Sequence, residues 1–432
     1  MVPATGGTDE EMERTMLEFA NRLKSVKISA SAAMTDKARE LRDAGVKIIS
    51  LSSGEPDFPT PSHAIEAAHQ AALAGDTKYP LQPGTVALRS AVQRKFKREN
   101  NLDYALDEIL VANGGKQIIF NALFATCNPG DEVVIPAPGW ITYADIVVLA
   151  EATPVPVACP ENNQFKLRPA DLDAAITPST KWLILNFPNN PTGAACTRAE
   201  MRAIADVMLK HPDVWILTDD IYEHLTYDGF EFCTIAEVEP ALKPRVLTVN
   251  GASKAYAMTG WRVGYCGGPK KLIQAMNNVH GQATGPICTL SQAAATAVLD
   301  GPQQLLKERA DVYRERRDLV VSLLNRIPGI TCHKPEGAFY VFPNIAGCIG
   351  KTTEGGRRLK TDADFIAALL EEQHVAAVHG GAYGMSPYFR ISYATDTAAL
   401  KEGLQDRELL RRPALTGIAK AIGNPLSWKL SF

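Results

Sequence analysis

Residues 253–264 carry the clearest chemical signal in the sequence. Lys254 stands between small residues just after the apolar run 246–249, and Arg262 follows eight positions later. A lysine is a strongly hydrated charge that rarely lies deep in a protein without a partner or a task. A lone amine at the end of a buried strand suits Schiff-base formation with an aldehyde cofactor or a carbonyl substrate. Taken alone, the segment fits a solvated loop lysine equally well.

Polar residues or glycines also follow three further apolar runs. They are Asn190 after 182–185, Asp219 and Tyr222 after 214–217, and Gly115 and Lys116 after 109–111. Ligands of open α/β sheets bind beyond the carboxyl ends of the strands, so we expect these strand ends to converge on one pocket. Each motif also has a structural alternative, because Asn-Asn-Pro-Thr-Gly and Gly-Gly both make turns and an Asp-Asp pair can cap a helix.

Two more residues are unusual for their surroundings. Trp140 follows Pro-Ala-Pro-Gly, where its ring could stack on a flat ligand or pack in the core. Arg390 lies within the apolar run Phe-Arg-Ile-Ser-Tyr. A buried arginine needs a partner, which would be an internal carboxylate or a ligand anion.

The elements that must position these residues alternate between strand-like and helix-like patterns. The candidate strands are 47–51, 109–111, 132–135, 153–157, 182–185, 214–217, 246–249 and 262–266. Most of these runs are apolar throughout, which is typical of a mostly parallel sheet covered by helices on both faces. Residues 35–45 predict a short helix, a long charged helix is expected at about 302–326, and a smaller α+β region runs through 337–342 and 389–393.

Composition narrows the class of protein. The chain has 432 residues, 46% of them hydrophobic, and a formal net charge of −3, so nothing drives it toward nucleic acid or anionic membranes. No apolar stretch reaches the roughly 20 residues of a membrane span, and the acidic N-terminus does not resemble a secretory signal. Eight scattered cysteines without a CxxC pair indicate reduced thiols in the cytoplasm and no metal site.

Longer motifs extend the argument from single residues to a family. They are GEPDF, TKYPLQPGT, ANGGKQ, NFPNNPTG, DDIYEHLTYDG, SKAYAMTGWRVGY, EGAFYVF and FRISYAT, in this order. Through them the chain resembles, from about residue 26 to 410, the class I aminotransferases that depend on pyridoxal 5′-phosphate. Within that class it is most similar to the bacterial and plastid-type aspartate aminotransferases, some of which also use prephenate.

The resemblance implies the fold of type I pyridoxal-phosphate-dependent transferases, an α/β domain with a smaller α+β domain. The implied division is an N-terminal arm at 1–25, a small domain formed by 26–60 and 302–412, a large cofactor-binding domain at 61–301 and a C-terminal tail at 413–432. It also implies a cytoplasmic homodimer with shared active sites. The partners would be amino acids and 2-oxo acids, with no nucleic acid and no membrane.

The resemblance also assigns roles around the cofactor. Lys254 would form the covalent link and then move the substrate proton, while Asp219 would keep the pyridine nitrogen protonated. Tyr222 and Asn190 would hydrogen-bond the 3′-oxygen, and Trp140 would stack on the ring. The residues that would hold the phosphate are Gly115, Lys116, Ser253, Arg262 and, from the neighbouring subunit, Tyr79.

Substrate recognition follows in the same way. Arg390 would bind the α-carboxylate, with Gly54 and Asn190 beside it, and Phe339 would line the pocket. Lys116 would bind the distal carboxylate of an acidic substrate; its structural alternative is a solvated lysine at a helix start. The remaining candidate, Thr35, matches a threonine linked to prephenate use; its alternative is a helix N-cap.

The chain departs from the family pattern at Asp220, where glutamate is frequent, and at Gly139, which precedes Trp140 in place of tyrosine. Neither change removes a group that the reaction needs. The leading hypothesis is transamination of L-aspartate with 2-oxoglutarate in two half-reactions. The alternatives are a prephenate, aromatic or kynurenine-type aminotransferase, a β-lyase on the same scaffold and, as a non-enzyme, a ligand-sensing regulator.

Overall fold

The computed structural model describes residues 20–26 and 29–405 of the chain. Most of the expected N-terminal arm and the whole of the expected tail at 413–432 lie outside these residues. Within them, no helix combines the length and the apolar character needed to cross a membrane. All eight cysteines are free thiols.

The central sheet has seven strands in the order β2-β8-β7-β6-β5-β3-β4. Its strands are β2 (Ile109–Ala112), β3 (Glu132–Ala137), β4 (Thr153–Ala158), β5 (Thr180–Leu185), β6 (Trp215–Asp219), β7 (Val246–Gly251) and β8 (Gly264–Gly267). Only β8 runs antiparallel to its neighbours. The predicted mostly parallel sheet is therefore confirmed, and the carboxyl ends of β5, β6 and β7 lie along one edge.

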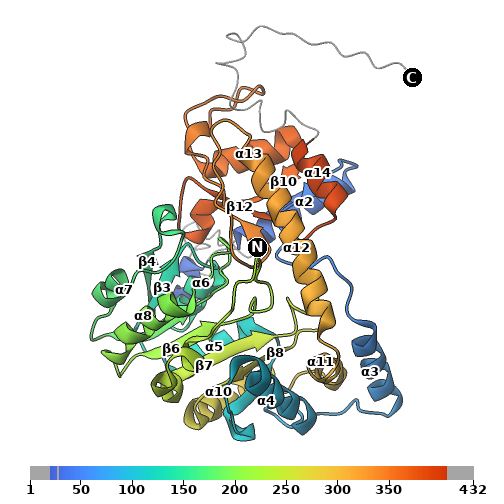
Figure 1. Ribbon diagram of the computed structural model, residues 1–432, viewed down its shortest axis with the longest axis vertical. Coiled ribbons are helices and arrows are strands. Elements are labelled where there is room, and N and C mark those ends of the chain that lie inside the picture. Colours follow the sequence, from blue (N-terminus) through green and yellow to red (C-terminus); the bar gives the residue numbers. More distant parts are fainter. Residues whose placement is uncertain (1–19, 27–28, 406–432) are drawn as a thin grey trace, which may run out of the picture.

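Helices cover both faces of this sheet, as predicted (Figure 1). Alternate residues of a strand point to opposite faces, so Leu183 and Trp182 belong to different hydrophobic clusters. The first cluster packs α3 (Ser62–Leu73), α4 (Val86–Asn100), α7 (Pro169–Ala175), α8 (Arg198–Leu209), α9 (Ile235–Val238) and α11 (Thr289–Asp300). The second packs α5 (Gly115–Thr126), α6 (Thr142–Leu149) and α10 (Lys270–Ala283).

A separate hydrophobic core lies in the upper part of Figure 1. Its helices are α12 (Gln304–Leu324), α13 (Asp362–Gln373) and α14 (Thr397–Gln405), and α2 (Ala30–Asp43) packs nearby. The strands of this region are β1 (Ile49–Ser50), β9 (Tyr340–Val341), β10 (Val375–Ala376), β11 (Val378–His379) and β12 (Phe389–Ser392). The long helix α12 runs from the sheet region up into this core.

Short 3-10 helices complete the described elements. They are η1 (Asn21–Ser25), η2 (Leu106–Glu108), η3 (Glu161–Asn163), η4 (Pro240–Arg245), η5 (Ala346–Cys348) and η6 (Gly380–Tyr383).

The structure corrects three local predictions. Helix α2 begins at Ala30, so Thr35 lies inside it and the N-cap alternative for Thr35 is wrong; Ser29 holds the N-cap position. The strand expected at 47–51 is reduced to the two residues of β1. The N-cap alternative for Asp219 is also wrong, because Asp219 ends β6 and a turn follows it.

Strand register fixes where Arg390 points. In the small antiparallel sheet β11-β12-β9, Ser392 pairs with Tyr340. Arg390 lies two residues before Ser392 and therefore on the same face of β12. Tyr340 and Arg390 are thus diagonal neighbours across two strands, close enough for long side chains to touch.

Candidate active site

A cavity of about 530 Å³ lies at the carboxyl ends of β5, β6 and β7, beside the N-terminus of α5. Cavities of this size are typical of sites for small molecules. Its walls include the predicted site residues Gly54, Gly115, Lys116, Trp140, Asn190, Asp219, Tyr222, Ser253, Lys254, Arg262 and Arg390. The strand ends that were expected to converge on one pocket do so.

Lys254 follows β7, and its side chain is partly buried in the cavity wall. Its amine donates a hydrogen bond to the backbone oxygen of Gly54 at 2.5 Å. Burial and the charge of Arg390 lower the pKa of Lys254 to about 8, although Glu55 and Asp219 act in the opposite direction. A fraction of this amine is therefore neutral near neutral pH, and the neutral form is both nucleophile and base.

Asp219 presents a buried carboxylate to the same cavity. The hydroxyl of Tyr143, on α6, donates a hydrogen bond to its Oδ2 at 2.7 Å, and Asn186 donates to its backbone oxygen at 2.8 Å. Burial raises the pKa of Asp219 to about 6, while the bond from Tyr143 and the charge of Lys254 limit the rise. A carboxylate in such surroundings is stabilised by a cationic partner.

The N-terminus of α5 and Arg262 form an anion site at one end of the cavity. Gly114 has φ 87°, and a Cβ on it would lie 2.6 Å from Arg262 Nη2, so glycine is what allows the guanidinium to rest there. Two backbone carbonyls accept hydrogen bonds from the guanidinium at 3.0 and 3.2 Å. Ser253 and the start of α5 at Gly115 complete a group of donors suited to an anion.

Arg390 is only 3% exposed and is held in place from several sides. Its Nη1 donates to Asn190 Oδ1 at 3.0 Å, and its Nη2 donates to the backbone oxygen of Ser52 at 2.6 Å. The guanidinium lies 4.6 Å from the ring centre of Tyr340 and 5.2 Å from that of Tyr383. A planar fork fixed between two rings at a cavity wall is suited to bidentate binding of a carboxylate.

Trp140 and Lys116 lie together in the wall of the cavity. The Lys116 amine is 5.2 Å from the centre of the Trp140 ring, a cation–π contact. Lys116 is exposed whereas Trp140 is half-buried. This pair offers a flat apolar surface with an exposed positive charge beside it.

Three predicted site residues are not part of the cavity wall. Tyr79 is 95% exposed, and Thr35 is a half-buried residue of α2. Phe339 is fully buried, with its ring centre 5.9 Å from the Lys254 amine. The adjacent Tyr340 lines the cavity instead.

Among the residues of this wall that sequence reasoning missed are Tyr143, Asn186, Tyr340 and Tyr383. One signal was available for Tyr340, because neighbouring residues of a strand face opposite sides and only one of Phe339 and Tyr340 could face the cavity. For Tyr143, its place one helical turn after Trp140 was the available hint.

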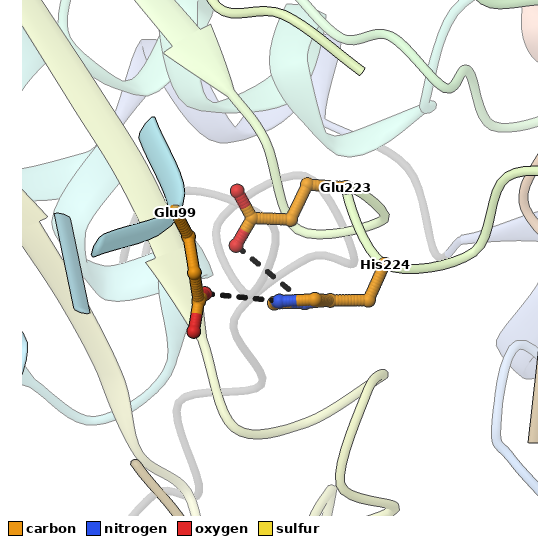
Figure 2. A group of neighbouring side chains, drawn as sticks. All are labelled: Glu99, Glu223 and His224. Carbon is orange, nitrogen blue, oxygen red and sulfur yellow. Dashed lines mark hydrogen bonds and ion pairs between the residues drawn. The ribbon is translucent and has the colours of Figure 1, made fainter. Parts of the chain in front are cut away.

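A cluster behind the site has the spacing of a metal centre. In the described part of the chain, ligand atoms of Glu99, Glu223 and His224 lie within 4.8 Å of one another. Figure 2 shows the imidazole between the two carboxylates, with Nε2 3.0 Å from Glu99 and Nδ1 3.5 Å from Glu223. Two carboxylates and an imidazole at this spacing attract a cation. A fourth side chain provides that cation.

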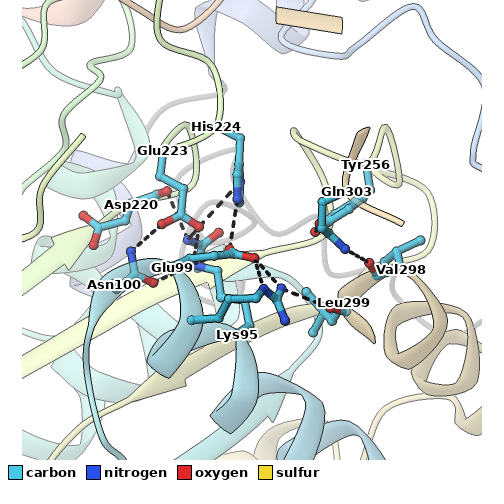
Figure 3. A network of polar contacts seen from close by, with 12 residues as sticks. Lys95, Glu99, Asn100, Asp220, Glu223, His224, Tyr256, Val298, Leu299 and Gln303 are labelled. Atoms are coloured by element: carbon cyan, nitrogen blue, oxygen red, sulfur yellow. Dashed lines mark hydrogen bonds and ion pairs between the residues drawn. The ribbon is translucent and has the colours of Figure 1, made fainter. Parts of the chain in front are cut away.

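That side chain is Lys95, shown in Figure 3 against the same carboxylates. Its fully buried amine forms an ion pair with Glu223, lies 3.5 Å from Glu99 and donates to Asn100 Oδ1 at 2.7 Å. The ammonium therefore occupies the place of a metal ion. Because Glu223 and His224 follow directly after Tyr222, this ion cluster ties the loop that carries Tyr222 to helix α4.

The arrangement suits a site in which a lysine amine forms a covalent bond with a carbonyl group. It combines a lysine of lowered pKa, a buried carboxylate, an anion site at one end of the cavity and a fixed arginine fork in its wall. The fold and this constellation define the class of protein. The model of the family "Aminotransferase class I and II" matches residues 46–406, and the chain belongs to that family.

Relatives within the family are closely similar. The chain is 53% identical to an aspartate aminotransferase of Rhizobium meliloti strain 1021, over 89% of this chain and 94% of the relative. It is also 53% identical to an aspartate/prephenate aminotransferase of Cereibacter sphaeroides, over 90% of this chain and 97% of the relative.

Solved structures agree with the sequence comparison. The aspartate aminotransferase structure from Rhizobium meliloti superposes with a TM-score of 0.88 at 52% identity, covering 91% of this chain and 98% of that chain. The Thermus thermophilus aspartate aminotransferase with maleate gives a TM-score of 0.84 at 38% identity, covering 90% and 98%. The predicted family and fold class are thus confirmed, and the protein is an aminotransferase.

Proposed function

We propose that this enzyme transfers the amino group of L-aspartate to 2-oxoglutarate, giving oxaloacetate and L-glutamate in two successive half-reactions, with pyridoxal 5′-phosphate as cofactor. The observation that carries the proposal is the meeting of Lys254, Asp219 and Arg390 in one cavity. The 53% identity to the aspartate aminotransferase of Rhizobium meliloti supports the choice of substrate.

The cavity suits this cofactor because its charged and hydrogen-bonding groups are arranged to match the charges of the cofactor. The anion site of Gly115, Ser253 and Arg262 would hold the phosphate, and the buried carboxylate of Asp219 would pair with a protonated ring nitrogen. The Trp140 ring would cover one face of the cofactor. When bound, pyridoxal phosphate supplies an aldehyde that condenses with amines and a ring that accepts the electrons released at the substrate Cα.

Proton movement is assigned to Lys254. With a pKa of about 8, its Nζ is neutral often enough near neutral pH to accept the proton from the substrate Cα. The Tyr222 hydroxyl and the Asn190 amide would donate hydrogen bonds to the 3′-oxygen and so influence how firmly the neighbouring nitrogen holds its proton.

Substrate recognition is assigned to two cations. Arg390 would bind the α-carboxylate that every amino acid and 2-oxo acid substrate carries. Lys116, which is exposed in the cavity wall beside Trp140, would bind the second carboxylate of aspartate and glutamate. An acidic substrate therefore uses both cations, whereas a neutral one uses only Arg390.

The enzyme would work as a homodimer in which Tyr79 reaches the phosphate of the partner's site. A large aromatic side chain that is 95% exposed supports such a contact. Sedimentation analysis gives the assembly state, and Tyr79→Phe should weaken cofactor binding without changing the dimer.

Prephenate is the second candidate substrate, because a relative at 53% identity is named aspartate/prephenate aminotransferase. Prephenate also carries two carboxylates, so Arg390 and Lys116 could bind it in the same way. Comparison of kcat/KM for prephenate and oxaloacetate as acceptors separates the two candidates.

The testing experiment is an absorbance spectrum of the purified enzyme with bound cofactor, recorded before and after addition of L-aspartate without any oxo acid. We expect the band of the lysine-bound cofactor to decline and that of the amine form to rise. A Lys254→Ala protein should show neither change. A spectrum that responds to L-phenylalanine and not to L-aspartate would contradict the substrate assignment while leaving the cofactor assignment intact.

A further inference from the structure

Two tyrosine rings lie against the guanidinium of Arg390, and their hydroxyl groups have different surroundings. The Tyr340 hydroxyl lies 2.9 Å from that of Tyr222, in a fully buried pair. The Tyr383 hydroxyl is also buried but has no hydrogen-bond partner among the described residues. Both tyrosines therefore contact the guanidinium of Arg390, but among the described residues only Tyr340 connects it, through a hydroxyl contact, to Tyr222.

The connection joins two segments that are far apart in sequence but belong to one hydrophobic cluster. Tyr340 lies on β9 beside Arg390 of β12, as the strand register requires, while Tyr222 belongs to the loop after β6. The rings of Tyr222 and Tyr340 meet edge to face, with centres 5.8 Å apart. Gly54 lies close by, since a Cβ on it would be 3.0 Å from the Tyr340 hydroxyl. The packing holds the two hydroxyl oxygens beside each other.

The 2.9 Å contact allows either hydroxyl to donate. The guanidinium of Arg390 lies 4.6 Å from the ring centre of Tyr340, and a nearby positive charge makes a hydroxyl more acidic and a better donor. This contact favours Tyr340 as the donor and Tyr222 as the acceptor; burial raises the pKa of both tyrosines, and Arg390 opposes the rise at each. The hydrogen of Tyr222 is then free to point into the cavity, where a hydrogen bond that it donates is strengthened by the one that it accepts.

We propose that Tyr340 is a positioning residue that links the carboxylate site at Arg390 to the hydroxyl of Tyr222. This inference rests on the proposed function, in which Tyr222 donates to the 3′-oxygen of the cofactor. When no substrate carboxylate is bound at Arg390, Tyr340 would be a strong donor and Tyr222 in turn would donate strongly. A carboxylate bound at Arg390 would weaken both hydrogen bonds, and the nitrogen that would join the cofactor to Lys254 would then hold its proton more firmly.

A second connection from Arg390 runs through Asn190 Oδ1, at 3.0 Å. Removal of the Tyr340 hydroxyl should therefore reduce the response to a carboxylate and not abolish it. Tyr340→Phe keeps the ring against the guanidinium, so binding of the carboxylate itself should change by less than about twofold, the equivalent of roughly 0.4 kcal/mol.

The test is a spectroscopic pH titration of the lysine-bound cofactor in the intact enzyme, with and without saturating maleate as a dicarboxylate that cannot react. Tyr340→Phe should raise the midpoint in the free enzyme by about half a pH unit and reduce the further rise caused by maleate. Tyr383→Phe, the matched control on the same arginine, should leave the midpoint unchanged.

A double variant tests whether Tyr340 acts through Tyr222. Tyr222→Phe should raise the midpoint more than Tyr340→Phe does, and adding Tyr340→Phe to it should have no further effect. A midpoint in Tyr340→Phe that is unchanged or lower, or one that moves equally in both backgrounds, would overturn the inference. Absence of any titrating band in the wild-type enzyme would instead refute the proposed function, so the two failures are distinguishable.

Discussion

Replacing Lys95 with methionine tests whether its ammonium is the cation of the cluster in Figures 2 and 3. Methionine has a similar length and no charge, so it removes the cation and keeps most of the packing. In the variant, the carboxylates of Glu99 and Glu223 would lie close to each other and to His224 without the positive charge of Lys95. Glu223 is 3% exposed, so water cannot take over the role of the ammonium.

The magnitude follows from the contacts that remain. Breaking a buried ion pair by removing one partner typically costs about 3–5 kcal/mol. Here Asn100 and Asn250 still donate to Glu223 at 2.7 and 2.8 Å, so we expect the lower end, about 3 kcal/mol of the free energy of unfolding. The matched control is Lys97→Met on the same helix, where the exposed pair with Asp103 is worth less than about 1 kcal/mol.

Urea denaturation of the cofactor-free proteins at one protein concentration is the assay, with the slope m checked for constancy. The double variant Lys95→Met with Glu223→Gln should recover most of the loss, because a buried pair replaced as a whole is often nearly neutral. Addition of Mn²⁺ should not stabilise the wild-type protein, since the cation position is already filled. A loss below about 1 kcal/mol in Lys95→Met, or stabilisation of the wild type by Mn²⁺, would refute the assignment.

Four further predictions concern charge and proton transfer. Asp219→Asn should keep the cofactor but slow the half-reaction with L-aspartate by about 10²- to 10³-fold, as seen by stopped-flow absorbance, because a neutral amide cannot hold the ring nitrogen protonated. Reductive labelling of Lys254 in the cofactor-free protein by a small aldehyde should speed up with pH and level off above its pKa of about 8, whereas an ordinary lysine would continue to respond up to about 10.5. Arg390→Lys should lower kcat/KM about 10²-fold for the amino donor and the oxo acid alike, since both carry an α-carboxylate and lysine cannot bind it bidentately. Burial would raise the pKa of Glu99, but the hydrogen bond from His224 and the charge of Lys95 lower it to about 2, below its ordinary 4.5. The ionised form is therefore favoured by folding, and its contribution to stability is present above pH 4.5 and lost between 4.5 and about 2, which urea midpoints across that range should detect.

The sheet and the groups at its edge could be predicted because each depends on local sequence. Buried parallel strands are continuous apolar runs, and the polar residue after such a run must lie at the carboxyl edge. This pattern predicts that Lys254 and Asp219 share one pocket, and both lie in the same cavity wall. Each side chain lies at or just after the end of its own strand, so its position follows from the local pattern.

The remaining features depend on contacts between distant segments. The bond from Tyr222 to Tyr340 joins residues 118 positions apart, and it exists only because β9 pairs with β12 in one register. A shift of one residue would turn Phe339 toward the cavity instead, which is the residue that the sequence favoured. Likewise, Lys95 looks like one of several lysines on an amphipathic helix, and only the packing of α4 against the loop after β6 buries it.

The charges of the cavity argue for acidic substrates independently of the similarity to known enzymes. The chain as a whole carries a net charge of −3, yet the charged side chains of this wall are Lys116, Lys254, Arg262 and Arg390 against Glu55 and Asp219. Lys254 would be neutral when it acts, and Arg262 would be paired by a phosphate. The two remaining cations match a substrate with two carboxylates, while a neutral amino acid brings no carboxylate to Lys116, whose charge then has, among the described residues, only the attraction of Asp145. Discrimination should therefore weaken as salt is added, because Lys116 is exposed and its charge is screened, whereas the buried Arg390 keeps its affinity for the α-carboxylate.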